Sequence, residues 1–114
     1  MRGFETHVYS REPHNDARAE LVAATGGTYV SSAERDAAQR AEQVGTIDLV
    51  YEATGVTSVS FAVLQHLGIN GIYVFTGIPG HQGPRPTDTA ALICSMVLRN
   101  RIVLGTVNAH RPAF

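Results

Sequence analysis

The stretch Asp48-Leu49-Val50-Tyr51-Glu52-Ala53-Thr54-Gly55 decides the fold of this chain. It reads as an acidic residue, a short apolar strand and a turn of small residues that ends in glycine. A strand of this kind is typical of a parallel sheet that is buried on both faces, and open α/β sheets bind ligands at the carboxyl ends of such strands. Because Gly55 has no side chain, the backbone there can approach a flat cofactor closely. The alternative interpretation is an ordinary strand that ends in a glycine turn.

Composition and charge narrow the classes of function. The chain has 114 residues, which suits one domain, and a formal net charge of −1 at pH 7. This charge predicts neither a nucleic-acid-binding surface nor a basic membrane-binding patch. No apolar run approaches the roughly 20 residues that cross a bilayer, and no apolar signal core follows Met1, so we expect a cytoplasmic location. The single cysteine, Cys94, lies among apolar residues and is expected to be a buried, unreactive thiol.

Strand and helix signals alternate along the sequence. Apolar and β-branched runs predict strands over residues 4–10, 28–30, 47–51, 72–75 and 102–104. Capping residues and apolar spacing predict helices from Asn15 or Asp16 to Ala24, over residues 33–43 after a Ser31/Glu34 capping box, from Val56 with Leu67 on its apolar face, and from Thr87 or Asp88 to Asn100. A turn is expected at Asn70-Gly71. This alternation predicts an α/β fold with a doubly wound parallel sheet in one domain, residues 1–114.

The carboxyl ends of the predicted strands supply the candidate site residues. After the first predicted strand, Ser10 and Arg11 offer a hydroxyl and a guanidinium, which suit the 2'-phosphate of NADP. Glu12 leaves an alternative open, because it can pair with Arg11 or bind a ribose hydroxyl. A solvent-exposed surface charge is a further interpretation of Arg11.

Three later strand ends add to this set. Thr76 and Gly77 are expected to place backbone amides near a nicotinamide, and Thr54 and Gly55 follow the strand predicted over residues 47–51. Asn108 is expected to bond the carboxamide of that ring, although a plain turn residue is the alternative. No catalytic residue can be assigned from spacing, and the five histidines lack the spacing of metal ligands, so we expect no metal site here. The sequence also contains no glycine-rich turn between a first strand and a first helix, the element that binds the pyrophosphate of a dinucleotide.

Several segments together resemble a known family. They are Tyr9-Ser10-Arg11-Glu12-Pro13, Gly26-Gly27-Thr28-Tyr29-Val30, Asp48 to Gly55, Asn70-Gly71, Phe75-Thr76-Gly77, Met96-Val97-Leu98-Arg99-Asn100 and Gly105-Thr106-Val107-Asn108. With this order and spacing, the chain resembles the cofactor domain of glucose 1-dehydrogenases of the zinc-containing medium-chain dehydrogenase superfamily, of the archaeal type. The resemblance covers nearly the whole chain.

The resemblance implies NADP or NAD as the cofactor and oxidation of a sugar C1 hydroxyl to a lactone. It implies that the adenosine end meets Tyr9, Ser10 and Arg11, and that the nicotinamide end meets Phe75, Thr76, Gly77, Thr106, Val107 and Asn108. The family often has two basic residues after its second strand. Ser10 replaces one of them, which leaves the choice between NADP and NAD open.

The resemblance also implies that this sequence is an internal fragment. The family's catalytic domain with its zinc ligands, the first strand and the glycine-rich loop all lie outside it. We therefore expect a truncated Rossmann-like sheet, a longer protein that is a homo-oligomer, and an isolated chain that is inactive. Three alternatives remain: a fragment of another medium-chain alcohol or polyol dehydrogenase, a non-enzymatic nucleotide-binding or assembly module, and a nonfunctional remnant.

Overall fold

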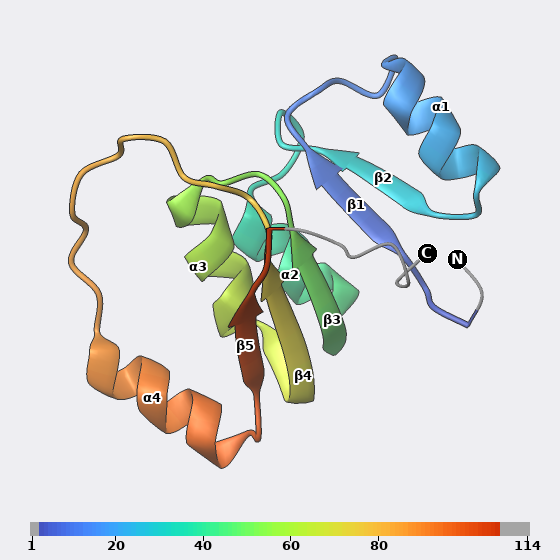
Figure 1. Cartoon of the computed structure of the whole chain (residues 1–114). Helices are drawn as coiled ribbons and strands as arrows, with labels where there is room; N and C mark the ends of the chain where they lie inside the picture. Colours follow the sequence, from blue (N-terminus) through green and yellow to red (C-terminus); the bar gives the residue numbers. More distant parts are fainter. Residues whose placement is uncertain (1–2, 108–114) are drawn as a thin grey trace. The chain divides into compact units, whose positions relative to one another are not determined.

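Five parallel strands form two separate sheets in the computed structural model, which describes residues 3–107. Strand β1 (His7–Ser10) pairs with β2 (Thr28–Ser31), and β3 (Ile47–Glu52), β4 (Leu67–Phe75) and β5 (Ile102–Gly105) pair in the order β3-β4-β5 (Figure 1). Each sheet belongs to one of two units, Met1–Arg40 and Ala41–Phe114. The predicted α/β class with parallel strands is confirmed. The two strand orders match the two parts of a 3-2-1-4-5-6 sheet from which strand 1 is missing.

In the first unit, helix α1 (Ala17–Ala24) begins where the sequence predicts. Asp16 is its N-cap, and the Asp16 carboxylate accepts a hydrogen bond from the amide of Arg18 at 2.8 Å. The helix ends before Gly26, whose φ of 85° suits glycine. Tyr29 and Val30 of the following strand are buried.

Helix α2 (Ala37–Val44), which crosses the boundary between the units, begins later than the sequence predicts. Its capping box is formed by Asp36 and Gln39: the Gln39 amide donates to Asp36 Oδ1 at 2.8 Å, and the Asp36 amide donates to Gln39 Oε1 at 3.4 Å. The predicted Ser31/Glu34 box is wrong. Ser31 is the last residue of β2. Its hydroxyl oxygen accepts a hydrogen bond from the Ala33 amide at 3.2 Å, and the residues that follow form a turn.

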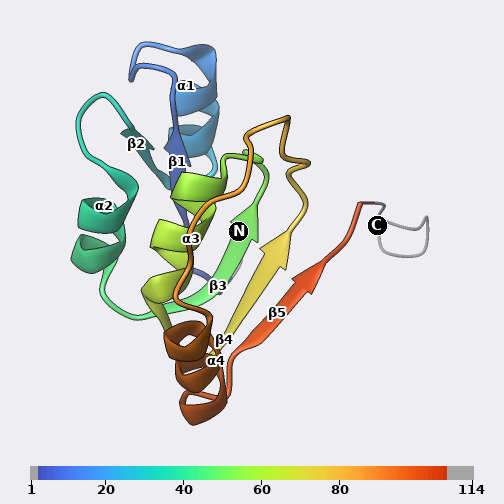
Figure 2. The same ribbon diagram turned by 90° about the vertical axis from the view of Figure 1, so that its left-hand side faces the viewer.

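In the second unit, α3 (Thr57–Gln65) and α4 (Thr89–Leu98) lie on the same side of the three-stranded sheet (Figures 1 and 2). Leu64, Leu67 and Tyr73 form the centre of the core, and the partly buried side chains around them are Ile47, Val50, Val63, Phe75, Leu92 and Val103. The Tyr73 hydroxyl donates to the carbonyl of Ser60 at 2.9 Å. This bond satisfies the polar end of a fully buried ring.

Two predictions at the start of β4 are wrong. Leu67 belongs to the strand, because α3 ends at Gln65, and Asn70-Gly71 lies inside β4. The pairing with β3 shifts register there, so that the expected turn is a bulge, with Asn70 at φ 58°. A Cβ on Gly71 would lie 2.6 Å from Leu67 Cγ, so glycine makes room for the core leucine.

The opposite face of this sheet exposes apolar side chains. They alternate along the strands with the core residues and are Leu49, Tyr51, Ile72, Ile102 and Leu104. Helix α4 buries none of its residues, and Cys94 on it is exposed, so the predicted buried thiol is wrong. No helix within residues 3–107 is long and apolar enough to cross a membrane.

Candidate functional site

Glu52 organises the carboxyl ends of β3 and β4. Its side chain is buried, and Oε1 accepts hydrogen bonds from the Thr54 amide at 2.7 Å, the Thr54 hydroxyl at 2.5 Å and the Gly55 amide at 3.0 Å. Its main-chain oxygen accepts from the amides of Thr76 at 2.8 Å and Gly77 at 3.0 Å. The structure therefore brings together four of the predicted site residues, through an acid that the sequence analysis did not single out.

Two glycines allow the loops after these strands to touch. Gly55 has φ 66°, and a Cβ on it would lie 2.6 Å from the carbonyl oxygen of Ile78. A Cβ on Gly77 would overlap the nitrogen of Gly55 and lie 2.9 Å from the carbonyl carbon of Ala53. Both glycines are thus required by contact between backbones. An approach of the Gly55 backbone to a cofactor stays a prediction.

Gln82 fastens the long loop after β4 to the start of α3. Its Nε2 donates to the Gly55 carbonyl at 2.8 Å, and its Oε1 accepts from the Thr57 hydroxyl at 2.8 Å and the Thr57 amide at 3.3 Å. The N-cap residue of α3, Val56, has no side chain that can accept such a bond. The sequence contained one signal for the role of Gln82: the predicted helix from Val56 begins without a capping residue, so its first amides need an acceptor from elsewhere.

An open hollow of about 550 Å³ lies at the carboxyl ends of β4 and β5, and it is lined by Phe75, Thr76, Gly77, Ile78, Pro79, Gly105, Thr106 and Val107. The amides of Thr76 and Gly77 already donate to Glu52, and the Thr106 amide donates to the Phe75 carbonyl at 2.9 Å. All three amides therefore have acceptors within the chain, and a contact of the Thr76 and Gly77 amides with a nicotinamide stays a prediction. The lining residues Phe75, Ile78, Pro79 and Val107 also give the hollow apolar surface. Asn108 lies outside the described residues.

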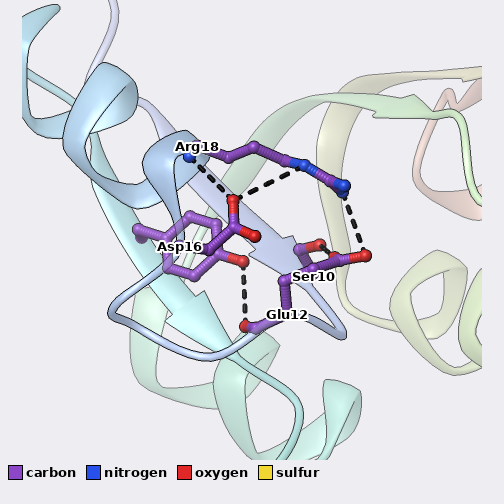
Figure 3. A network of polar contacts seen from close by, with 5 residues as sticks. Ser10, Glu12, Asp16 and Arg18 are labelled. Carbon is purple, nitrogen blue, oxygen red and sulfur yellow. Dashed lines mark hydrogen bonds and ion pairs between the residues drawn. The ribbon is translucent and has the colours of Figure 1, made fainter.

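In the first unit, the residues after β1 form a polar network (Figure 3). The Ser10 hydroxyl donates to the carboxylate of Glu12, and Arg18 Nη1 lies 3.0 Å from Glu12 Oε1. The hydroxyl of Tyr29 donates to the Glu12 carbonyl at 2.9 Å. Glu12 thus pairs with Arg18, whereas the sequence left a pairing with Arg11 open. The Arg11 side chain is exposed.

This network favours the ionised form of Glu12. The hydrogen bond from Ser10 is the largest cause that lowers the pKa of Glu12 from its ordinary 4.5, and the charge of Arg18 acts in the same direction. At the other side of the strand end, burial raises the pKa of Tyr9, whose hydroxyl donates to the Arg35 carbonyl at 3.0 Å. A carboxylate beside Ser10 can accept a bond from a ribose hydroxyl but repels a nearby phosphate.

The predicted site residues thus fall into two groups. Tyr9, Ser10 and Arg11 lie in the first unit, and the others that are described lie in the second. Within residues 3–107, no three His, Cys, Asp or Glu side chains lie close enough to hold a metal ion.

Comparison with known proteins identifies relatives of this chain. The family model described as glucose dehydrogenase C-terminus matches residues 1–114. Glucose 1-dehydrogenase 2 of Vulcanisaeta moutnovskia is 35% identical over 109 residues, which are 96% of this chain and 29% of that protein. Glucose 1-dehydrogenase of Methanocella arvoryzae is 29% identical over 98% of this chain and 31% of that protein.

Among solved structures, glucose dehydrogenases have a similar fold. The crystal structure of glucose dehydrogenase from Haloferax mediterranei matches with a TM-score of 0.82 at 26% identity, over 96% of this chain and 30% of that one. The same Haloferax enzyme in complex with NADP, Zn and gluconolactone matches with a TM-score of 0.81. The chain therefore spans less than a third of the length of these proteins.

Proposed function

Because this chain belongs to the family of the glucose dehydrogenase C-terminus, we propose that it is part of a longer NAD(P)-dependent glucose 1-dehydrogenase. That enzyme oxidises the C1 hydroxyl of glucose, or of a related aldose, to a lactone. The observation that carries the proposal is the hollow at the ends of β4 and β5, which lies where open α/β sheets bind ligands. The Haloferax enzyme, a relative in fold and sequence, is solved with NADP and gluconolactone.

The residues of the hollow fit a nicotinamide ring. Phe75, Ile78, Pro79 and Val107 offer apolar surface that excludes water from a flat ring. With the amides of Thr76 and Gly77 engaged, main-chain oxygens of the lining segments are the groups that accept bonds from the carboxamide. The bound NADP or NAD supplies the acceptor of the hydride that leaves the sugar.

The adenosine end of the cofactor is proposed to lie on Tyr9, Ser10 and Arg11. Arg11 is exposed and suits a phosphate, whereas the ionised Glu12 beside Ser10 suits a ribose hydroxyl. We therefore propose that both NADP and NAD are accepted, and that Glu12 moderates the preference for NADP.

The rest of the enzyme is proposed to lie outside this chain. We propose that residues 1–114 are part of one NAD(P)-binding domain and that the zinc ligands belong to a separate catalytic domain. The described residues of this chain would not hold the zinc ion, because no three His, Cys, Asp or Glu side chains lie together among them. We further propose that the whole enzyme is a cytoplasmic homo-oligomer and that the isolated chain is inactive.

The test is an activity assay of the longer protein. With glucose and either NADP or NAD, we expect formation of the reduced cofactor, which is followed by absorbance, and of a lactone. The matched control is 1-deoxyglucose, which lacks the C1 hydroxyl and should not react. Oxidation of alcohols or polyols without oxidation of aldoses would favour the alternative dehydrogenase. Failure to bind either nucleotide would favour the assembly module, and nucleotide binding without oxidation of any substrate would favour the non-enzymatic nucleotide-binding module.

A further inference from the structure

Glu52 is a buried acid to which the proposed function gives no task. Its side chain and backbone together are only 5% exposed. One carboxylate oxygen, Oε1, accepts three hydrogen bonds, while Oε2 is buried without a hydrogen-bond partner among residues 3–107. Burying a carboxylate costs free energy unless its bonds compensate for lost hydration. This cost indicates that the carboxylate of Glu52 has a role that a neutral side chain could not fill.

The bonds of Glu52 connect two loops. Through Oε1 it holds Thr54 and Gly55, which follow β3. Through its main-chain oxygen it holds Thr76 and Gly77, which follow β4, and the Thr76 hydroxyl donates to the same oxygen at 2.9 Å. Since Gly77 packs against the backbone of residues 53–55, a shift of that turn displaces residues 76 and 77 as well.

The second of these loops forms one wall of the hollow. We propose that Glu52 is a positioning residue for the nicotinamide half of the cofactor. It acts through the turn at residues 53–55, which supports the wall at Thr76 and Gly77, and it does not touch the ring itself. This inference rests on the proposed function. It states that Glu52, at the end of β3, holds the loop after β4 in position.

The experiment measures the two halves of the cofactor separately. Binding of reduced nicotinamide mononucleotide and of AMP to the longer protein is measured by titration calorimetry for the natural sequence and for Glu52→Ala. Removal of hydrogen bonds to a charged group is expected to weaken binding of the nicotinamide half by about tenfold or more, with AMP affinity unchanged within about twofold. Glu52→Gln keeps an acceptor oxygen and should restore most of the affinity.

Controls separate positioning from general destabilisation. Asp48→Ala removes an exposed acid from the same strand and should change neither affinity. If Glu52→Ala does not fold, Glu52→Asp, which withdraws the carboxylate from the turn by one methylene, should show the same pattern to a smaller degree. Equal losses for both halves, or no loss, would overturn the role of Glu52. Absence of binding of both halves by the natural sequence would instead overturn the proposed function.

Discussion

At the scale of single residues, Gly77 is the described glycine at which an added Cβ would come closest to another atom, the nitrogen of Gly55. The place of its missing side chain is occupied by the backbone of Gly55 and Ala53, and a backbone cannot move aside as a flexible side chain can. Gly80, three residues later in the same loop, has open space around it and no positive φ. The two glycines therefore form a matched pair for a test.

We predict that Gly77→Ala destabilises the longer protein by about 1–3 kcal/mol, because the added methyl group overlaps main-chain atoms. Gly80→Ala should change stability by less than about 0.5 kcal/mol. Unfolding in urea, followed by circular dichroism, gives both values. Similar values for the two variants would show that the loops after β3 and β4 are not in the contact described here.

At the scale of elements, α3 depends on a residue from another segment. Its first amides lack a cap from Val56, and Gln82 supplies the acceptor from the loop between β4 and α4. The same side chain donates to Gly55. One loop residue thus ties together the helix start, the turn after β3 and the middle of a long connection.

For Gln82→Ala we predict a loss of about 1 kcal/mol, the usual effect of removing a helix cap, and faster hydrogen exchange at the Thr57 amide. Gln82→Glu keeps the acceptor for Thr57 and adds a negative charge at a helix N-terminus, so it should protect this amide better than alanine does. Exchange is measured by NMR or mass spectrometry. Equal exchange in all three proteins would remove Gln82 from this role.

At the scale of the whole molecule, residues 3–107 leave much apolar and hydrogen-bonding surface without a partner among themselves. Among residues 3–107, β1 pairs only with β2, and β3 pairs only with β4, so one edge of each strand is unpaired. One face of the three-stranded sheet exposes five large side chains, whereas parallel sheets are normally covered on both faces. Each of these edges is available for pairing with a further strand.

We predict that the isolated chain is marginally stable. A central strand missing from the sheet removes several main-chain bonds at about 1 kcal/mol each, which is comparable with the 5–15 kcal/mol stability of a whole domain. Thermal unfolding of a monomeric sample should be broad, with a low midpoint, and a dye for exposed apolar surface should bind. The longer protein serves as the control. A sharp transition at high temperature from the monomeric chain would contradict this prediction.

Local signals in the sequence predicted most elements because they act between near neighbours. Asp16 and Asp88, each one of two predicted candidates, cap their helices, and the five strands lie within a few residues of their predicted positions except at the start of β4. The wrong predictions concern residues whose structure depends on contacts with residues far away in the sequence. Leu67 joined a strand because β3 is available to pair with it, and Cys94 is exposed because nothing among the described residues covers its side of α4.

The sequence by itself determined the α/β class and the strand-helix order, since these follow from spacing and capping residues, and its motifs showed a resemblance to the family that the family model confirms. Only the tertiary structure decided how the strand ends work together. Glu52 and Thr76 are 24 residues apart, and Gln82 and Thr57 are 25 apart. Bonds over such separations leave no periodic pattern in a sequence, because they depend on where folding brings two loops together.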